Sequence, residues 1–401
     1  MRLTSIRAEN FKSFGNLDIQ LDKLNVLIGA NASGKSNFVQ LFTFLRDLVE
    51  SGLDNAISIQ GGPQYLGNIN CSEGAHVTIE LSVESDDGDP IVPLMPDHGD
   101  SRVVRCWYRF SLALDGARTV IVTEDELRIE RRGRGLPANS NVFTIRREGD
   151  KYQMEGDSDL FASFLMDSLE ARKDEARPPM LLIEYEMLRL MLPLNSLKLI
   201  ATYDIDSKGP KTAVFFGRKS ELEPDAHNLA IVLAKILSDE NDRRKLLNLL
   251  RDFLPFADKL DTEPLKDSSL LFSMRERFSP LPMPASFLSD GTIDVISLIV
   301  ILYFERKQFV VIEEPERNLH PSLISKLVEL FKDASRQKQI IISTHSPEIV
   351  RYVEPKQLIL ISRDSSGSSH ADRPANKAQI QQFLRDEITM EELYVQNLLE
   401  V

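Results

Sequence analysis

The feature that most constrains this sequence is an eight-residue motif near the N-terminus, Gly29-Ala30-Asn31-Ala32-Ser33-Gly34-Lys35-Ser36. It fits the pattern G-x-x-x-x-G-K-[ST], in which the backbone N–H groups of a glycine-rich loop surround phosphates. An apolar run over 24–28 predicts a strand before the motif, and apolar residues at helical spacing over 38–49 predict a helix after it. Strand, loop and helix start place aligned N–H groups and a helix dipole at one point, which suits an anion. The alternative is a glycine-serine turn that fits by accident, and the flanking strand and helix disfavour it.

This P-loop (residues 29–36) predicts binding of a nucleoside triphosphate, with Lys35 at the outer phosphates and the Ser36 hydroxyl as a Mg²⁺ ligand. A polar turn between two aromatic residues, Asn10-Phe11-Lys12-Ser13-Phe14, precedes it. This turn is either an ordinary hairpin turn or a segment beside the nucleotide, and the pattern alone does not choose. The residues expected to bind the nucleotide are Lys12, Ser13, Asn31, Ser33, Gly34, Lys35, Ser36 and Asn37.

Composition limits the class of protein. The chain has 401 residues, 42% apolar and 27% charged, which is typical of a soluble globular protein with two or three domains. Two cysteines cannot form a disulfide framework, so we expect a reducing cytoplasm. The longest apolar run, 295–304, is about half a membrane span, and we expect no membrane segment. A net charge of −13 gives no global attraction to nucleic acid, so any DNA or RNA contact must use local basic patches. The candidate patch is Arg128, Arg131, Arg132 and Arg134, although such a cluster is more often a solvated hairpin tip.

Periodicity along the chain predicts an α/β fold. Alternating apolar and polar residues over 77–83, 103–114 and 119–130 predict antiparallel strands, and the pattern from 157 to about 260 is helical. A Ser-rich loop at 364–376 and an amphipathic helix at 378–399 are expected to end the chain. The predicted parts are the N-terminal half of an ATPase domain with an antiparallel β-lobe (1–156), a helical insertion lobe (157–268), the C-terminal half (269–362), and a final loop and helix (363–401).

Two acids follow a second buried strand. Phe309 to Ile312 is apolar and leads into Glu313-Glu314-Pro315-Glu316. Adjacent carboxylates at the end of a buried strand are costly without a partner, and a bound Mg²⁺ supplies one. We expect Glu313 to hold the ion, and Glu314 to orient and deprotonate an attacking water. An exposed acidic loop is the alternative.

Two further motifs supply candidate site residues. Ser289-Asp290-Gly291 precedes an apolar helix over 293–303, where free N–H groups form a second candidate anion site, although the same residues make a good helix N-cap. His345 follows a strand over 339–342, at the strand edge where open α/β sheets bind ligands. It is placed to donate to a γ-phosphate or to the attacking water.

In this order, the motifs resemble the ABC-type ATPase heads of the RecF/SMC group. Within that group the sequence is most similar to the OLD-like ATPases, through Asn-Phe-Lys-Ser-Phe at 10–14, Gly-Ala-Asn-Ala-Ser-Gly-Lys-Ser-Asn at 29–37, Glu-Glu-Pro-Glu at 313–316, Leu-His-Pro at 319–321 and Ser-Thr-His-Ser-Pro at 343–347. The resemblance covers nearly the whole chain. It implies a P-loop NTPase head with a mixed sheet, flanking helices, an antiparallel β-lobe and a helical insertion.

The resemblance also implies a mechanism. Two heads pack head to tail around two ATP molecules, and Ser289 and Gly291 of one copy close over the γ-phosphate held by the other. Glu314 and His345 complete the site in the closed dimer. The sequence departs from the group twice. Glu313 stands where many relatives have Asp, and no glutamine is clearly placed as the magnesium-sensing residue, for which Gln64 is the best candidate.

OLD nucleases continue into a metal-dependent nuclease domain, and after Ile361 this sequence has no Asp-x-Asp pair and no clustered His or Cys ligands. The resemblance then implies a separately encoded effector or nuclease as partner, a homodimer or higher assembly, and a role in phage defence, DNA repair or DNA maintenance. Two alternatives remain. An ATPase subunit of a membrane transporter is disfavoured by the long stretch between Ser36 and Leu288, and a slow nucleotide-dependent scaffold by the intact Lys35, Glu313 and Glu314.

Overall fold

The computed structural model describes residues 2–68, 70, 75–85, 102–115, 119–132, 142–148, 151–156, 197–215, 217, 220–265, 268–378, 380, 388–396 and 398–399. The chain forms two compact units. Unit 1 contains residues 1–23, 29–200 and 360–373, and unit 2 contains residues 24–28, 201–359 and 374–401. Each unit is described separately below.

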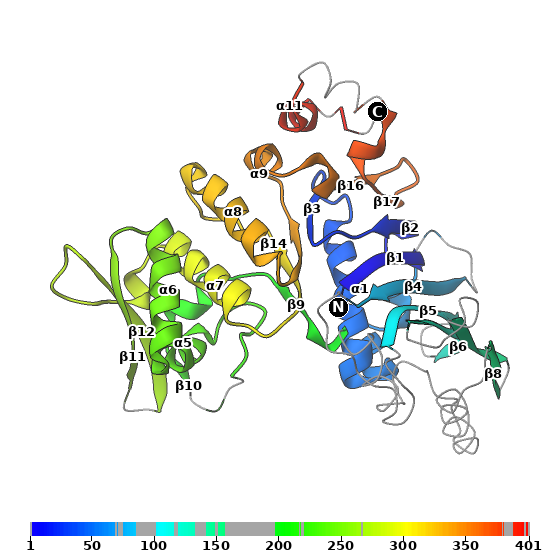
Figure 1. Cartoon of the computed structure of the whole chain (residues 1–401), viewed down its shortest axis with the longest axis horizontal. Helices are drawn as coiled ribbons and strands as arrows, with labels where there is room; N and C mark the ends of the chain where they lie inside the picture. The colour runs from blue at the N-terminus through cyan, green and yellow to red at the C-terminus, as the bar shows by residue number, and fades with distance from the viewer. Residues whose placement is uncertain are drawn as a thin grey trace. The chain divides into compact units, whose positions relative to one another are not determined.

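Unit 1 is built on a largely antiparallel sheet whose strands follow the order β8-β7-β6-β5-β4-β1-β2-β17-β16 (Figure 1). Side chains alternate between a buried and an outer face, as the period of two predicts. On β5, for example, Cys106, Tyr108 and Phe110 are fully buried, whereas Trp107 and Arg109 lie on the other face. The strands are β1 (Arg2–Phe11), β2 (Phe14–Gln20), β4 (His76–Glu84), β5 (Arg102–Asp115), β6 (Thr119–Arg132), β7 (Val142–Glu148), β8 (Lys151–Glu155), β16 (Leu358–Arg363) and β17 (Ser369–Asp372).

Helix α1 (Lys35–Ser51) starts at the end of the P-loop and packs against this sheet. Its apolar face is fully buried, and the ring of Phe38 lies 6.4 Å from that of Phe14 on β2. A second ring contact, 6.0 Å between Phe44 and Phe11, joins the same helix to β1. These contacts fix the direction in which α1 leaves the P-loop. Helix α2 (Leu53–Ile59) and the short 3₁₀ helix η1 (Pro63–Tyr65) follow.

Unit 2 contains four neighbouring strands in the order β3-β15-β14-β9, of which β3, β15 and β14 are parallel. Their bounds are β3 (Leu24–Ile28), β9 (Ile200–Tyr203), β14 (Phe309–Glu313) and β15 (Gln339–Ser343). Every residue of β3 and β15 is buried, as continuous apolar runs predict for parallel strands. The associated helices are α7 (Asp290–Tyr303), α8 (Ile324–Ala334), α9 (Pro347–Tyr352) and α11 (Met390–Val395).

A second, smaller sheet in unit 2 has the order β10-β12-β11, with β13 paired to β12 (Figure 1). Two helices, α5 (Leu229–Ser238) and α6 (Glu240–Phe253), contact its strands and each other. α6 also contacts α7, which is buried from Thr292 to Leu302. The strands are β10 (Val214–Phe215), β11 (Ala257–Pro264), β12 (Ser269–Glu276) and β13 (Met283–Pro284).

The structure corrects three expectations about secondary structure. The stretch predicted as helical also contains β9, β10 and the first half of β11, a polar strand that forms because β12 pairs with it. The loop predicted at 364–376 contains β17, which pairs with β16 on one side and β2 on the other. The final helix is not continuous, because 388 and 389 are non-helical and Thr389 caps a new helix, α11. The predicted helical face at 161–169 lies outside the described residues.

Candidate active site

The P-loop of unit 1 ends in a left-handed glycine directly before helix α1. Gly34 has φ of 115°, a conformation that L side chains rarely adopt, and it precedes the first turn of α1. The Lys35 ammonium donates to Gly29 O at 2.8 Å and to Ala30 O at 2.9 Å. The Ser33 side chain is 4% exposed, and its Oγ has no hydrogen-bond partner among the residues described. A buried hydroxyl without a partner costs free energy, and a phosphate oxygen would supply the missing partner, so these residues fit a triphosphate.

The polar turn after β1 lies directly beside the P-loop. The Ser13 hydroxyl accepts a 2.7 Å hydrogen bond from the Asn37 side chain on α1. Lys12 has φ of 51°, and its backbone N–H donates to Leu66 O at 2.9 Å. Burial lowers the pKa of the Lys12 ammonium. The structure thus brings Ser13 and Asn37 together under the P-loop, while Asn31 and Ser36 are exposed on it.

In unit 2 the parallel register aligns three strand ends. Glu313 of β14 pairs with Ser343 of β15, and Ser343 pairs with Leu27 of β3. Because parallel strands share one carboxyl edge, the acidic motif, the Ser343-Thr344-His345 segment and the end of β3 all lie along the same edge. The P-loop starts at Gly29, two residues beyond Leu27 in the chain. Within unit 2, the acidic motif and the Ser343-Thr344-His345 segment therefore follow adjacent strands at the edge where β3 also ends.

Glu314 occupies a strained turn at this edge. Its φ is 42°, and its backbone N–H donates to Ser343 O at 3.0 Å. Its carboxylate lies 3.6 Å from His345 Nε2 and 3.2 Å from an Arg317 guanidinium nitrogen. Arg317 also pairs with Asp204 at 3.2 Å. Two of the predicted catalytic residues, Glu314 and His345, are thus neighbours. Sequence reasoning missed Arg317 and Asp204, because an Arg among acids gives no signal of which carboxylate it contacts.

The third acid of the motif has a structural role. Glu316 Oε1 accepts a 2.5 Å hydrogen bond from the Thr344 hydroxyl, and burial raises the pKa of the Glu316 carboxyl. This bond joins the turn after β14 to the segment after β15. The bond therefore limits the movement of Glu314 and His345 relative to each other.

The predicted signature residues begin helix α7. Ser289 is the N-cap, and its Oγ accepts from Thr292 N–H at 3.2 Å, as the simpler interpretation of this motif predicts. Asp290, in the first turn, pairs with Lys211, whose hydrogen bond lowers the pKa of that carboxyl. Ser289 is exposed, so the N-cap role leaves its side chain accessible to solvent.

Two contacts tie this helix to the turn after Glu314. The Asn318 side-chain amide donates a 3.0 Å hydrogen bond to Asp294 Oδ2. A Cβ on Gly291 would lie 2.6 Å from Asn318 O, so only glycine allows the observed approach. Asp294 is 4% exposed, and burial raises the pKa of its carboxyl to about 6. Sequence reasoning missed Asn318 and Asp294, since neither belongs to a motif with a known chemical role.

Two predicted features receive no support from their surroundings. Gln64 is exposed on η1, and its side chain donates only to Gly61 O at 3.3 Å among the contacts described, so its magnesium role stays a prediction. In the basic cluster, Arg128 is exposed and its guanidinium lies 4.9 Å from the Trp107 ring. Arg134 and the side chains of Arg131 and Arg132 lie outside the described residues.

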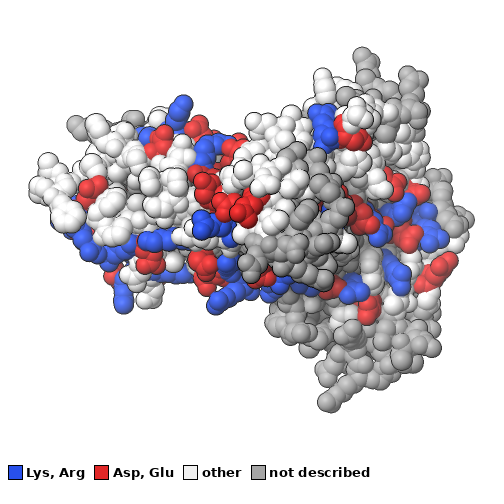
Figure 2. Space-filling model, turned by 90° about the horizontal axis from the view of Figure 1, so that it is seen from above, with Lys and Arg blue, Asp and Glu red and all other residues white. Residues whose placement is uncertain are grey.

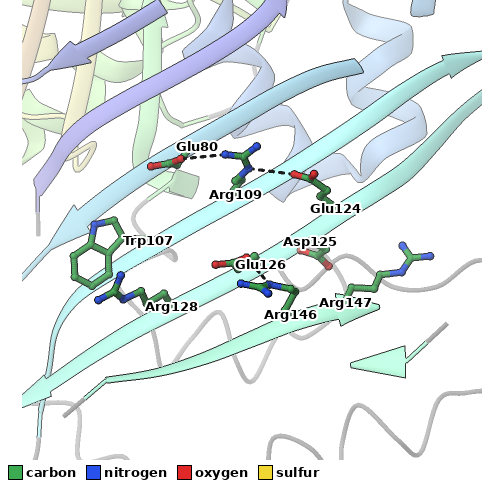
Figure 3. Close-up of a pocket in the computed structure, with 9 residues that line it drawn as sticks. All are labelled: Glu80, Trp107, Arg109, Glu124, Asp125, Glu126, Arg128, Arg146 and Arg147. Atoms are coloured by element: carbon green, nitrogen blue, oxygen red, sulfur yellow. Dashed lines mark hydrogen bonds and ion pairs between the residues drawn. The ribbon is translucent and has the colours of Figure 1, made fainter. Parts of the chain in front are cut away.

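Arg128 and Trp107 also line a pocket of about 510 Å³ on the outer face of the β-lobe (Figure 3). Two of its arginines pair with carboxylates: Arg109 pairs with Glu124 at 3.1 Å, and Arg146 pairs with Glu126 at 2.8 Å. The pocket therefore presents matched charges instead of a basic surface. On the face drawn in Figure 2, Lys and Arg side chains likewise lie beside Asp and Glu side chains.

The described residues contain no group of three or more His, Cys, Asp or Glu side chains that could hold a metal ion. Mg²⁺ commonly takes one or two protein oxygens together with waters and substrate phosphates, and Ser36 and Glu313 offer oxygens of that kind. Within the ranges that the structure covers, every helix falls short of the length and apolarity needed to span a bilayer.

Comparison with known proteins finds similarity to ATPase domains in two parts of the sequence. A family model described as "AAA domain, putative AbiEii toxin, Type IV TA system" matches residues 194–351, and one described as "AAA ATPase domain" matches residues 1–78. The chain is similar to the DNA replication and repair protein RecF of Desulforudis audaxviator (strain MP104C), with 49% identity over 45 residues. That match spans 11% of this chain and 12% of the length of the relative.

Among solved structures, an SMC head bound to the C-winged helix domain of ScpA matches with a TM-score of 0.50 and 14% identity. The match covers 93% of this chain and 97% of that chain, and at this identity it shows the fold alone. The α/β head predicted from the sequence is confirmed, whereas the OLD-like subgroup stays a prediction. The sequence is thus similar to AAA ATPase domains over residues 1–78 and 194–351, and the fold is similar to that of an SMC head.

Proposed function

We propose that this chain binds ATP with Mg²⁺ at the P-loop and hydrolyses it at a site completed by a second copy. The observation that carries the proposal is the register of Leu27, Ser343 and Glu313 on adjacent parallel strands. Because of this register, the strands that precede the P-loop, the His345 segment and the acidic pair all end at one edge of the sheet.

In the proposed reaction the P-loop N–H groups and Lys35 hold the phosphates. Glu314 orients a water molecule and accepts its proton, and the water oxygen attacks the γ-phosphorus. The bond from the γ-phosphorus to the bridging oxygen breaks, and ADP and phosphate leave. Mg²⁺, held through Ser36 and Glu313, supplies charge neutralisation when it is bound. His345, 3.6 Å from Glu314, donates to the γ-phosphate or to the attacking water.

The exposed Ser289 and the N-terminal N–H groups of α7 are proposed to close over the γ-phosphate bound by a second copy. ATP would then hold two copies together, and hydrolysis would release them. The dimer is proposed to gate a separately encoded partner, such as an effector or nuclease, in nucleic-acid handling or phage defence. The solved SMC head is bound to a winged-helix domain of ScpA, which supports a protein partner here.

Phosphate release from ATP in the presence of Mg²⁺ tests the catalytic part. We expect Lys35→Ala and Glu314→Gln each to lower kcat by at least a hundredfold, with ATP still bound by Glu314→Gln. Glu329→Gln, the same substitution at an exposed site on α8, is the matched control and should keep wild-type turnover. Wild-type turnover in Lys35→Ala would mean that the loop does not hold the substrate.

A further inference from the structure

The hairpin of β16 and β17 lies against the P-loop of unit 1, although 336 residues separate the contacting positions. Ser369, the first residue of β17, is fully buried. Its hydroxyl donates to Ser33 O at 2.7 Å and lies 2.8 Å from Ser13 Oγ. Its backbone N–H donates to Ser13 O at 2.7 Å. Ser369 therefore joins the P-loop to the turn after β1.

A second residue of the hairpin contacts the preceding peptide of the P-loop. Arg363 Nη1 donates to Ala32 O at 3.4 Å. Its Nε donates to Gly367 O at 2.6 Å, which fixes the guanidinium within the hairpin. Two successive P-loop carbonyls, those of Ala32 and Ser33, thus accept hydrogen bonds from one hairpin.

These anchors determine which way the loop amides point. A trans peptide unit is planar and holds its C=O and N–H in opposite directions. When Ser369 holds the carbonyl of Ser33, the N–H of Gly34 in the same peptide must point to the opposite side of the loop. N–H groups turned to one side are what a P-loop offers to phosphates.

The packing at this contact leaves no room for a side chain at Gly34. A Cβ on Gly34 would overlap Ser369 Oγ and lie 3.0 Å from Ser13 Oγ. The Ser13 hydroxyl is in turn held by Asn37 on α1 at 2.7 Å. One chain of hydrogen bonds thus runs from Asn37 through Ser13 and Ser369 to the P-loop backbone.

We propose that the β16–β17 hairpin presets the P-loop for phosphate binding, with Ser369 as a positioning residue and Arg363 as its second anchor. The inference rests on the proposed ATP site and names residues outside the motifs that define that site. Ser369 does not touch the nucleotide in this account. It acts through the orientation of the peptide between Ser33 and Gly34.

The test compares three variants of the full chain by ATP affinity, by ATP turnover and by melting temperature without nucleotide. Ser369→Ala removes the anchor on Ser33 O, and Arg363→Ala removes the anchor on Ala32 O. Ser111→Ala is the matched control, because Ser111 is a buried serine of β5 whose hydroxyl bonds to Thr78 and Glu124. The Ser111→Ala variant loses a comparable number of hydrogen bonds. In the strand order of the sheet, β5 is separated from β17 by β4, β1 and β2.

We expect Ser369→Ala to weaken ATP binding about tenfold, the typical effect of one lost hydrogen bond with an unsatisfied partner. KM for ATP should rise with it, while kcat at saturating ATP stays within about threefold, since the loop contacts the phosphates before and during reaction. Arg363→Ala, an exposed position with a longer bond, should weaken binding about threefold. Ser111→Ala should lower the melting temperature and leave ATP affinity unchanged.

The inference is overturned if Ser369→Ala and Arg363→Ala both bind ATP with the wild-type affinity, within experimental error. It is also overturned if Ser111→Ala weakens ATP binding as much as Ser369→Ala does. If Ser369→Ala does not fold, Arg363→Ala decides alone by the same criterion. A wild-type protein that binds no ATP contradicts the proposed function itself. A wild-type protein that binds ATP, with variants that bind equally well, contradicts only the role of the hairpin.

Discussion

The side-chain amide of Asn318 donates a 3.0 Å hydrogen bond to Asp294, and this bond joins the turn after Glu314 to the helix that begins at Ser289. Asn318 has φ of 64°, so the turn holds it in a left-handed conformation from which its side chain reaches α7. Glu314 and Ser289 are proposed to serve two different nucleotides of a dimer. The bond therefore connects one half-site to the other within a single chain.

Loss of this bond should uncouple the two half-sites. We expect Asn318→Ala to lower kcat for ATP about tenfold, because the signature helix loses its fixed position relative to Glu314, while nucleotide affinity of the P-loop is unchanged. Steady-state turnover and equilibrium ATP binding measure the two effects. Asn248→Ala, at an exposed position on α6, is the control. Equal losses in binding and turnover would argue that Asn318 acts only on folding.

Gly291 should not tolerate a methyl group. Its Cβ would lie 2.6 Å from Asn318 O, which is backbone and cannot rotate away, so the first turn of α7 must shift. We expect Gly291→Ala to reduce turnover more than tenfold with nucleotide binding retained. Gly15→Ala is the control, because its nearest neighbour would be 3.9 Å away. Wild-type turnover in Gly291→Ala would show that the start of α7 does not take part in the reaction.

The buried Asp294 carboxyl should make stability depend on pH. Burial raises its pKa from an ordinary 3.8 to about 6, so the folded state binds its proton more tightly than the unfolded state does. Between these two values the free energy of unfolding must fall as pH rises, and the loss is complete above about pH 7. The difference between 3.8 and about 6 corresponds to at most roughly 3 kcal/mol, at about 1.4 kcal/mol per pH unit.

Asp294→Asn removes this titration and keeps an oxygen that can accept from Asn318. We expect the variant to gain stability relative to wild type as pH rises from 5 to 7.5, measured by urea unfolding at each pH. Other titrating groups cancel in the comparison. A stability difference that is the same at both pH values would contradict the assignment.

The sequence allowed prediction of the parts of the site whose chemistry is local. The P-loop, the acidic pair and His345 each follow a short apolar strand, so their positions at strand ends could be inferred from periodicity. Contacts between distant segments could not be inferred this way. Ser369 lies in a stretch with several other serines, and nothing in that stretch indicates which serine reaches Ser33.

The prediction of secondary structure failed where strand pairing overrides the local preference of the sequence. β11, with the sequence Ala-Asp-Lys-Leu-Asp-Thr-Glu-Pro, contains few strand-forming residues and exists because β12 aligns with it over most of its length. β17 is also polar and has only four residues, and it lies between β16 and β2. Such strands depend on partners that are far away in the sequence.

The central claim is that ATP joins two copies of this chain through half-sites on each. The most direct measurement is the molar mass of Glu314→Gln on a sizing column, with ATP and Mg²⁺ and without them. The account predicts a monomer without nucleotide and a dimer with ATP, because binding is kept and hydrolysis is blocked. The double variant Glu314→Gln with Gly291→Ala should stay monomeric. A Glu314→Gln protein that binds ATP and remains monomeric would contradict the composite site.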